Sequence, residues 1–382
     1  MHFELSHEQQ QLQSTVLRFA QAELAAGALE RAHNPAYPWD ISRRLAAMGL
    51  MGLCLPERDG GQGGTLMDAV IAIQAIASAC PRSADVIQAG NFGPVRVFAE
   101  YGSAWQKSRY LKPILAGEAL ISVGMSEPEA GSAVTELQTT ATPDGDGFRI
   151  NGSKVFTTHA PYAAVILCYV RFGPGVDGIG SVLIDTAAEG FRYGKVTQFM
   201  SGEEWRQLYF DNVYVPADMV VLKEGGFRRQ IAGFNVERLG NAARSIALAR
   251  YCFEQARSWA LQRKQFGKRI AEFQGIQWKF ADMKIKLDAA QLLLYQAASR
   301  ADAGFPSAED TAIAKHACNE WGFEIANESL QILGGAGYSQ DLLLEYCLRR
   351  CRGWMIAGGS LEILKNRIAE SVLGKFRPAS GA

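Results

Sequence analysis

The sequence has no excess of charge of either sign and no long hydrophobic run. Lys plus Arg and Asp plus Glu both number 39, so the formal net charge is zero. A nucleic-acid-binding protein is expected to show a basic excess or a basic stripe, so no nucleic-acid partner is expected here. A membrane-spanning helix needs roughly 18 or more consecutive apolar residues. No run in the sequence reaches that length, and no membrane partner is expected.

Closely spaced cysteines are also scarce. Seven cysteines are scattered along the chain, and only Cys347 and Cys351 lie near each other, at the i, i+4 spacing of a helix. A structural zinc site needs four ligands, commonly two such pairs, so we expect reduced, buried thiols and no metal site. The start, Met1–Leu5, has no basic region followed by an apolar stretch. We therefore expect no secretory signal and a cytoplasmic location.

Length and composition indicate a globular chain with more than one packed unit. The chain has 382 residues, of which 48% are hydrophobic and 20% are charged. Single cores stop growing beyond roughly 250–300 residues, so two or three units are expected. Residues 1–120 have helical patterns. Ser6 is placed to cap the first helix, with Gln9 as its capping-box partner.

Residues 121–225 change to short β-type runs separated by Gly and Asp. The runs at 165–170 and 181–184 are rich in Val, Ile and Leu and predict strands. Asn151-Gly152 lies between two further runs and predicts a tight hairpin turn, because both turn positions favour positive φ. The region as a whole predicts an antiparallel sheet or barrel.

Residues 226–382 return to helical periodicity. Apolar residues recur at steps of three and four, which places one seam against partner helices. The seam consists of Ile276, Phe280, Met283, Leu287, Ala290 and Leu294. Long helices with short joints predict an antiparallel bundle. The expected fold class is therefore α+β, with an N-terminal α-helical domain (1–120), a middle antiparallel β domain (121–225) and a C-terminal helical bundle (226–382).

One loop in the middle region carries groups suited to a nucleotide cofactor. In Ser122–Ser132, the hydroxyls of Ser126 and Ser132 accompany a close backbone approach at Gly131. Such a loop suits the rim and diphosphate of a flavin nucleotide, where N–H and O–H donors meet acceptors. A plain Pro/Gly loop that leaves the helical region is the alternative.

The following strand carries an aromatic ring and a hydroxyl. Phe156 and Thr158 are two residues apart and therefore lie on one strand face. They are suited to an isoalloxazine face and its N5, whereas core packing with a rim threonine is the alternative. His159 is expected to be a loop residue rather than an acid or base.

Two segments of the last region are suited to a nucleotide. Arg263–Arg269 is a short basic loop between long helices, and its charge can meet a diphosphate. A solvated turn explains it equally well. Gln331 and Gly334–Gly337 end another helix, where the glycines serve as C-caps or leave room for a nucleotide chain.

Together these motifs resemble the acyl-CoA dehydrogenase family over almost the whole chain. Several separate motifs in family order make the resemblance specific, whereas one alone would not. The motifs are Tyr37-Pro38-Trp39, Leu55-Pro56-Glu57 with Gly60-Gly61, Ser126–Ser132, Asn151–Lys154, Arg263–Gly267, Gln331–Tyr338 and Gly359–Ile363. The resemblance implies a C-terminal four-helix bundle, a homotetramer or homodimer, and non-covalent FAD at the interface of two subunits. It also implies an acyl-CoA substrate and electron-transfer flavoprotein as the electron acceptor.

The resemblance further implies site residues by position. The residues expected to line the flavin and its diphosphate are Met125, Ser126, Gly131, Ser132, Phe156 and Thr158. Those expected to hold the nucleotide end are Arg263, Gln265, Phe266, Gln274, Gln331 and Gly335. Ser360 and Glu362 are expected to close the site near the flavin, and Ser132 and Arg238 to contact substrate.

The chain departs from the family pattern at several positions. Phe156 stands where a tryptophan is usual, His159 where an asparagine is usual, and Arg350 where an aspartate is usual. Ala133 likewise replaces an aspartate. Ser201–Trp205 differs from the family's Gly-x-Arg-Gly-Ser, which weakens any inference about the substrate.

The most important departure concerns the catalytic base. Family chemistry removes an α-proton from an acyl-CoA thioester while a hydride leaves the β-carbon for flavin N5. The common catalytic position aligns with Gly358, which has no side chain. Members that resemble isovaleryl- and long-chain acyl-CoA dehydrogenases instead place the base in a Glu-Arg at the start of a bundle helix, and Glu237-Arg238 matches them. The expected reaction is α,β-dehydrogenation with Glu237 as base; a surface carboxylate paired with an arginine such as Arg244 is the alternative.

Two other classes of function stay open. Acyl-CoA desulfinase-like and enoyl-CoA reductase-like flavoproteins share the fold, and Ser126–Ala133 and Ile356–Gly359 look similar to the desulfinase group. In that group a glutamine tends to occupy the position of Glu237, so the glutamate favours dehydrogenation. The third class is a non-catalytic, FAD-containing binding protein, which the zero net charge and the absence of a basic tail disfavour.

Overall fold

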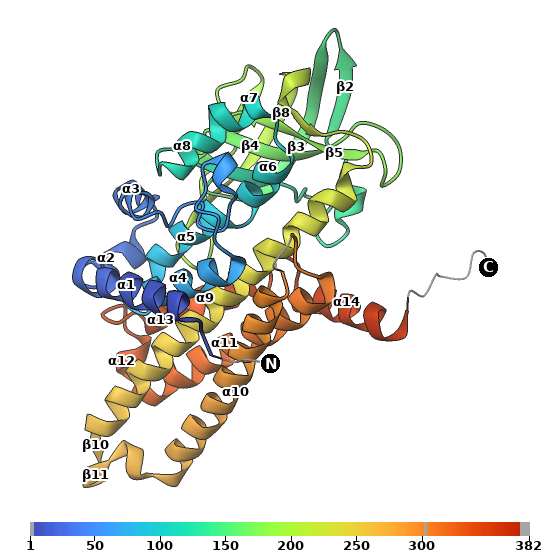
Figure 1. Cartoon of the computed structure of the whole chain (residues 1–382). Coiled ribbons are helices and arrows are strands. Elements are labelled where there is room, and N and C mark those ends of the chain that lie inside the picture. Colours follow the sequence, from blue (N-terminus) through green and yellow to red (C-terminus); the bar gives the residue numbers. More distant parts are fainter. Residues whose placement is uncertain (1–3, 302–303, 375–382) are drawn as a thin grey trace, which may run out of the picture. The chain divides into compact units, whose positions relative to one another are not determined.

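The computed structural model describes residues 4–301 and 304–374, and the chain divides into two compact units (Figure 1). The helical unit comprises Met1–Leu29, Ile73–Pro81 and Asn235–Ala382, and the sheet unit comprises Glu30–Ala72 and Arg82–Phe234. The long helix α9 (Gly226–Gln262) begins in the sheet unit and continues in the helical unit. Each core therefore joins segments that are far apart along the chain. The three-part division at residues 120 and 225 stays a prediction.

The sheet unit contains a nine-stranded sheet. Its order is β6-β8-β3-β2-β4-β5-β9, with β1 beside β4 and β7 beside β8. The strands are β1 (Ile121–Gly124), β2 (Thr140–Asp144), β3 (Gly147–Thr158), β4 (Val165–Arg171), β5 (Ile179–Asp185), β6 (Phe191–Tyr193), β7 (Thr197–Gln198), β8 (Glu204–Pro216) and β9 (Val220–Leu222). The predicted β region is confirmed. The sheet is mixed rather than purely antiparallel, because β1 and β2 each pair with β4 in parallel.

Helices of the same unit lie beside the sheet. Figure 1 shows α6, α7 and α8 next to the strands, and α6 contacts both β1 and β9. The helices are α3 (Trp39–Ala47), α5 (Ala84–Asn91), α6 (Pro94–Tyr101), α7 (Ala104–Gln106) and α8 (Lys112–Leu115), with a π-helical turn at Lys107–Leu111. α2 (Ala28–His33) and α4 (Leu66–Ala77) cross between the units. In β4, residues 165–170 are all buried, which explains why this strand is a continuous apolar run rather than an alternating one.

The hairpin turn predicted at Asn151-Gly152 is wrong. β3 runs straight through both residues, and its register against β8 shifts at this point, which marks a β-bulge. The turn between β2 and β3 lies at Gly145-Asp146 instead. Gly152 has φ +146°, and a Cβ there would lie 2.7 Å from the Cα of Thr139. A close approach of two backbones, and not a turn, requires this glycine.

The helical unit packs long helices along apolar seams. Met283, Leu287, Ala290 and Leu294 of the predicted seam are buried on α10, and α11 contacts α10, α13 and α14. The helices are α1 (His7–Glu23), α10 (Gln274–Ser299), α11 (Ala308–Leu333), α12 (Gly335–Tyr338), α13 (Leu344–Trp354) and α14 (Leu361–Leu373). Strands β10 (Lys264–Gln265) and β11 (Lys268–Arg269) form a small hairpin after α9. The capping box predicted at the start of α1 is confirmed.

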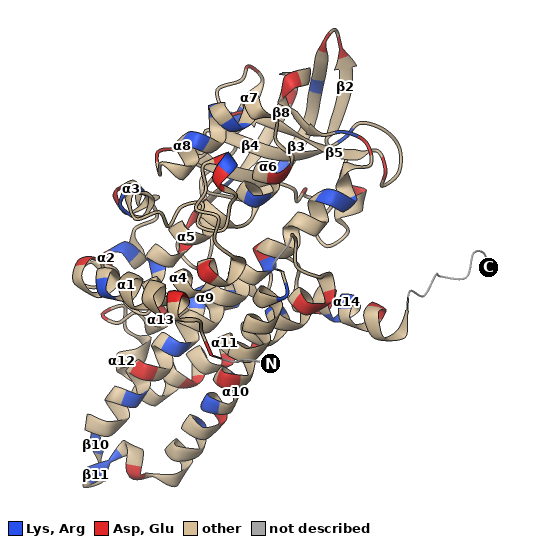
Figure 2. Cartoon of the chain, viewed as in Figure 1, with Lys and Arg blue, Asp and Glu red and all other residues tan. Residues whose placement is uncertain are grey.

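Acidic and basic residues both occur along the helices of this unit (Figure 2). Lys286 lies 2.6 Å from Glu324, and Lys279 pairs with Glu328, so both pairs link α10 to α11. Such partly exposed pairs contribute only about 0–1 kcal/mol each. The apolar seam therefore supplies most of the stabilisation between these helices. Among the described residues, no helix combines the length and the apolar character that crossing a membrane requires.

Candidate functional site

A buried ion pair anchors the loop that is predicted to meet the flavin. Lys154 Nζ lies 2.7 Å from Glu127 Oε1, and both side chains are almost completely buried. Glu127 also accepts hydrogen bonds from the backbone N–H groups of Gln138 and Thr139. Burial acts to raise the pKa of Glu127, but Lys154 and these hydrogen bonds outweigh it, so the pKa lies below its usual value. Because a buried charge requires such partners, the pair holds loop and strand in one arrangement.

The same lysine connects the loop to β3. Lys154 Nζ donates to the carbonyl of Met125 at 3.2 Å, and the backbone N–H of Val155 donates to the carbonyl of Ser126 at 2.9 Å. Gly131 and Ser132 are exposed further along the loop. A Cβ on Gly131 would have no atom within 4 Å. The loop thus leaves open space beside its hydroxyl groups, which fits the diphosphate of the expected cofactor.

The end of β3 presents the predicted aromatic ring and hydroxyl. Phe156 is 57% exposed and Thr158 is exposed, while Thr157 between them is buried. His159 has φ +58°, and its ring lies edge-on to Tyr37 with 5.4 Å between centroids, so it is a packed loop residue as expected. An exposed phenylalanine ring loses the stabilisation of burial unless a ligand covers it. This surface therefore fits a planar flavin ring.

Glu237, the predicted base, lies on α9 in the helical unit. Its side chain is 20% exposed, and its Oε1 lies 3.7 Å from Nη2 of Arg244. Arg244 is itself buried, donates to Oδ1 of Asn241 and lies over the Trp354 ring at 4.8 Å. Glu237, Asn241 and Arg244 are four and three residues apart, so they share one helix face. The expected arginine partner is thus present, and it is part of a buried cluster rather than of a solvated surface.

Arg238 contacts the turn around residue 358. Its Nε donates to the carbonyl of Gly358 at 3.3 Å, and its Nη1 donates to Oδ1 of Asn235 at 2.8 Å. Burial, with a smaller contribution from Arg367, lowers the pKa of Arg238 to about 10. These contacts give Arg238 a structural role at the turn. Its predicted contact with substrate stays a prediction.

The turn at Gly358 has no room for a side chain. Gly358 has φ +78°, and a Cβ there would lie 2.7 Å from Nδ2 of Asn241 and 3.3 Å from Cε of Lys315. Lys315 Nζ donates to the carbonyls of Trp354 and Gly359, each at 2.9 Å. Burial lowers the pKa of Lys315 to about 7; Arg238 adds to this effect and Glu237 opposes it. The position that aligns with the common catalytic glutamate is therefore closed by its neighbours.

The residues predicted to hold the nucleotide end lie at two places in the helical unit. Phe266 and Gly267 form the turn between β10 and β11 with φ +52° and +81°, the pattern of a type I′ turn. Phe266 is 94% exposed and lies edge-on to Phe273. The other predicted residues of this segment, all exposed, are Arg263, Gln265 and Gln274. Gln331 and Gly335 lie where α11 ends and α12 begins.

Ser360 and Glu362 belong to the start of α14. Ser360 is the N-cap, and its Oγ accepts a hydrogen bond from the backbone N–H of Ile363. A backbone hydrogen bond, and to a smaller extent a hydrogen bond with the Ser360 side chain, lowers the pKa of the exposed Glu362. A carboxylate at a helix N-terminus is favoured by the helix dipole. Helix capping explains both residues by itself, and their predicted place near the flavin stays a prediction.

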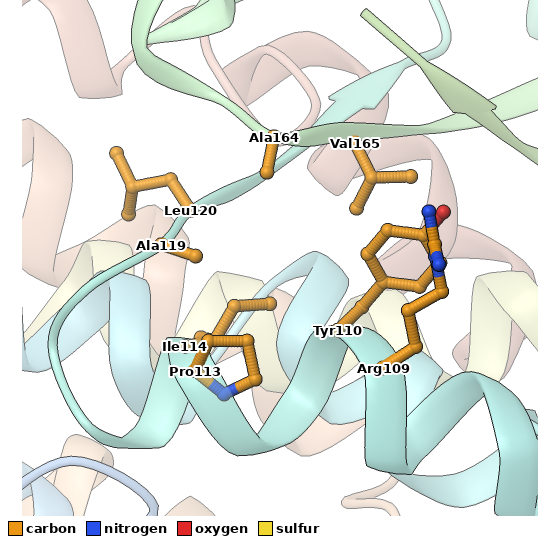
Figure 3. Close-up of a pocket in the computed structure, with 8 residues that line it drawn as sticks. All are labelled: Arg109, Tyr110, Pro113, Ile114, Ala119, Leu120, Ala164 and Val165. Atoms are coloured by element: carbon orange, nitrogen blue, oxygen red, sulfur yellow. The ribbon is translucent and has the colours of Figure 1, made fainter.

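A cavity of about 300 Å³ lies elsewhere in the sheet unit (Figure 3). It is lined by Arg109, Tyr110, Pro113, Ile114, Ala119, Leu120, Ala164 and Val165. Figure 3 shows the apolar side chains of Ile114 and Val165 on opposite sides of this space. None of the predicted site residues lines the cavity. It is therefore not the site that the sequence motifs predict.

Four contributing residues were missed from the sequence. Glu127 and Lys154 stand 27 residues apart and form no local pattern, so their ion pair has no sequence signal. Asn241 follows Glu237 by four residues, and this helical spacing would have placed it on the same face. Lys315 lies among small and apolar residues of α11 such as Ala312, Ala314 and Cys318, and a lysine in such surroundings is the signal that could have pointed to its burial.

Family models match almost the whole chain. The acyl-CoA dehydrogenase N-terminal domain matches residues 6–118, the middle domain matches residues 122–213, and the C-terminal domain matches residues 224–373. The three matches follow one another in chain order. They cover the loop, the strand and the helix that carry the residues described above.

Similar proteins include enzymes of different names. A 3-sulfinopropanoyl-CoA desulfinase of Paraburkholderia xenovorans (strain LB400) is 33% identical over 98% of this chain and 98% of its own length. A short-chain-specific acyl-CoA dehydrogenase of Clostridium acetobutylicum is 32% identical over 96% of this chain and 98% of its own length. An acryloyl-CoA reductase (NADH) of Anaerotignum propionicum is 33% identical over 98% of this chain and 96% of its own length.

Several solved structures are similar to this chain over almost its whole length. A glutaryl-coenzyme A dehydrogenase in complex with glutaryl-CoA has a TM-score of 0.93 at 30% identity and covers 98% of this chain and 97% of its own. PigA with FAD and proline has a TM-score of 0.91 at 26% identity, with 98% and 100% covered. A structure described for the electron transferring flavoprotein of Acidaminococcus fermentans has a TM-score of 0.92 at 29% identity, with 98% and 100% covered.

Proposed function

This chain belongs to the acyl-CoA dehydrogenase family, and we propose that it performs α,β-dehydrogenation of an acyl-CoA thioester with Glu237 as the base. Membership makes the chain an FAD-dependent oxidoreductase. FAD, when bound, accepts the hydride that leaves the β-carbon. The observation that carries the choice of base is the pairing of Glu237 with the buried Arg244, together with the closed turn at Gly358.

The residues that would hold FAD in the sheet unit are those of the loop and of β3. The hydroxyls of Ser126 and Ser132 would donate to diphosphate oxygens, and open space at Gly131 lets a ligand approach the backbone. Phe156 would lie against the flavin ring, and the Thr158 hydroxyl would donate to N5. The exposure of these groups next to a rigidly anchored loop supports the assignment.

Glu237 has the properties that abstraction of a carbon-bound proton requires. The base must be held in position, largely desolvated and ionised before the reaction. A side chain only 20% exposed meets the second condition, and the positively charged guanidinium of Arg244 lies 3.7 Å away. At that distance the contact is an ion pair rather than a hydrogen bond.

The substitution Glu237→Gln tests the assignment. Glutamine keeps the size of the side chain but cannot take the proton, so the variant is expected to retain FAD and to lose about 10²–10⁴-fold in kcat. Glu254→Gln on the same helix removes an exposed carboxylate that pairs with Arg257, and is expected to keep full activity. A panel of saturated acyl-CoAs, scored by anaerobic flavin bleaching, provides the substrate. Wild-type turnover in Glu237→Gln would reject the assignment.

Desulfination or reduction of an acyl-CoA is the second candidate. It is favoured by relatives named 3-sulfinopropanoyl-CoA desulfinase and acryloyl-CoA reductase, which are as similar to this chain as the named dehydrogenase. One experiment separates the reactions. Bleaching of the flavin by a saturated acyl-CoA supports dehydrogenation, whereas sulfite release from 3-sulfinopropanoyl-CoA without bleaching supports desulfination. Glu237 favours dehydrogenation, because that reaction requires a group that accepts the α-proton.

Partners follow from the same proposal. Electron-transfer flavoprotein is the proposed electron acceptor, and a similar structure described with such a flavoprotein supports it. Copies of this chain are the proposed partners of an apolar stripe on α10. Trp278, Ile285 and Leu292 recur every seven residues and are between 46% and 68% exposed. A heptad stripe left in solvent is covered most simply by another helix, which supports a homotetramer or homodimer.

A further inference from the structure

Three aromatic rings gather on one exposed face of the sheet unit. Phe156 lies 4.7 Å from Trp205 and 6.4 Å from Phe199, and Phe199 stacks on Trp205 at 5.9 Å, all between ring centroids. Phe156 and the neighbouring Met200 are more than half exposed. Contiguous apolar groups in solvent commonly mark a binding surface. Neither Phe199 nor Trp205 was among the residues predicted to contact the cofactor.

Strand pairing brings the ring of Trp205 to the cofactor side of β3. Trp205 on β8 is the register partner of Thr158 on β3. Register partners in an antiparallel pair project their side chains to the same face of the sheet. The register shifts between Lys154 and Thr157, and Phe156 within this irregularity has φ +56°. The bulge turns the ring of Phe156 toward Trp205, beside the exposed hydroxyl of Thr158.

A buried ion pair fixes the β7–β8 hairpin that carries Trp205. Arg82 Nη1 lies 2.9 Å from Oε1 of Glu203 and 3.1 Å from Oδ2 of Asp85, and all three side chains are at most 5% exposed. Glu203 also accepts a hydrogen bond from the hydroxyl of Ser201 at 2.7 Å. The charges are desolvated, so the hairpin cannot shift without leaving them unpaired.

The turn of this hairpin is equally constrained. The backbone N–H of Phe199 donates to the carbonyl of Glu203, and the N–H of Gly202 donates to the carbonyl of Phe199, both at 2.9 Å. Gly202 has φ +92°, which a residue with a Cβ rarely adopts. The aromatic rings are therefore held in place before any ligand arrives.

We infer that Trp205, supported by Phe199, contacts the flavin ring system of FAD together with Phe156. Three observations select this occupant. The family binds FAD, a Thr158 hydroxyl suited to a flavin nitrogen is next to Trp205, and a planar ligand is what a rigid aromatic surface accommodates best. The inference rests on the FAD of the proposed function but not on Glu237 as base.

The test is a titration of the apoprotein with FAD. Trp205→Leu removes the ring and keeps an apolar side chain, so the Kd for FAD is expected to rise about two- to tenfold. Trp205→Phe retains a ring and is expected to bind FAD within about twofold of wild type. Trp105→Leu is the matched control, because this tryptophan of the same unit is 48% exposed and lies beside Arg109 rather than near β3. It is expected to leave the Kd unchanged.

Fluorescence provides a second readout that does not depend on Leu being tolerated. FAD quenches the fluorescence of tryptophans that it contacts. The decrease in tryptophan fluorescence on adding FAD is therefore expected to be smaller in Trp205→Phe than in wild type. In the control Trp105→Phe the loss of quenching seen in Trp205→Phe is not expected. Unchanged Kd in Trp205→Leu and unchanged quenching in Trp205→Phe would overturn the inference. A changed acyl-CoA affinity with unchanged FAD affinity would also overturn it, because the rings would then belong to the acyl site. If the Glu237→Gln variant is active, Glu237 is rejected as the base, but the FAD titrations still test the role of Trp205.

Discussion

Gly358→Ala tests whether the turn at residue 358 is closed to any side chain. Gly358 has φ +78°, and the left-handed region costs a non-glycine residue about 1–2 kcal/mol. The new Cβ would also lie 2.7 Å from Nδ2 of Asn241, well inside van der Waals contact. Overpacking of this kind costs about 1–3 kcal/mol. The two terms together predict a loss of about 2–5 kcal/mol.

The neighbours of Gly358 decide where in that range the loss falls. Asn241 is 1% exposed and its Oδ1 is held by Arg244, so its amide cannot move away freely. Lys315 is fixed by the carbonyls of Trp354 and Gly359. Relief would therefore disturb hydrogen bonds on two helices. We expect a loss in the upper half of the range.

Thermal unfolding of the FAD-saturated protein measures the effect. At about 2–4 °C per kcal/mol, a loss in the upper half of that range, about 3.5–5 kcal/mol, is expected to lower the Tm of Gly358→Ala by about 7–20 °C. Gly353→Ala is the matched control, because a Cβ at this α13 glycine would meet no atom within 4 Å. Alanine is the better helix former by about 1 kcal/mol, so the control is expected to raise the Tm slightly. Equal Tm values for the two variants would refute the steric argument.

The same geometry predicts that the base cannot be moved back by one substitution. Gly358→Glu meets the same Cβ contacts as alanine and adds a longer side chain beside Lys315. In the background of Glu237→Gln it is therefore expected to restore no turnover. Recovery of activity to within tenfold of wild type would show that the turn adapts, and that the closure of this position does not select Glu237.

Two other predictions concern the helical unit. Burial lowers the pKa of Lys315 to about 7 from its ordinary value of 10.5, so between these values the unfolded chain binds more protons than the folded one. Stability then rises with pH across this window, by up to about 1.4 kcal/mol per pH unit. Lys315→Met is expected to lose this dependence, and parallel Tm profiles of variant and wild type from pH 7 to 10 would contradict it. Ile285→Glu places a charge in the exposed stripe of α10 and is expected to reduce the mass of the assembly measured by light scattering. The control Glu254→Gln, also at an exposed position, is expected to leave this mass unchanged. An unchanged mass in Ile285→Glu would exclude the stripe as the contact between copies.

Periodicity along the chain was sufficient to predict the main elements, because it is a local property. The seam through Met283, Leu287 and Leu294 is buried as its spacing predicts, and Ser6 caps α1. The hairpin at Asn151-Gly152 failed because the same dipeptide also suits a bulge. What decides between them is the approach of Thr139 to Gly152, a contact between separate strands that no local pattern contains.

The candidate site was predictable only where residue type and motif coincided. Phe156 and Thr158 were proposed because strand alternation places them on one face; both are exposed there, and their contact with the flavin stays a prediction. Trp205 was not, because its position depends on the register of β8 against β3. Glu237 came from the resemblance and not from its spacing. Its partner Arg244 was foreseen only as an ordinary surface ion pair, since burial cannot be read from a single arginine.

Both parts of the sheet unit that are proposed to face the flavin depend on a charge pair removed from solvent. Lys154 with Glu127 holds the loop at Ser126, and Arg82 with Glu203 holds the hairpin of Trp205. Buried pairs of this kind seldom add net stability over apolar packing, so stability alone does not account for them. They do restrict each segment to one position, because any displacement leaves a desolvated charge without its partner. A flavin that must be held in register for hydride transfer benefits from such restriction, since groups fixed in advance cost no ordering when the ligand binds.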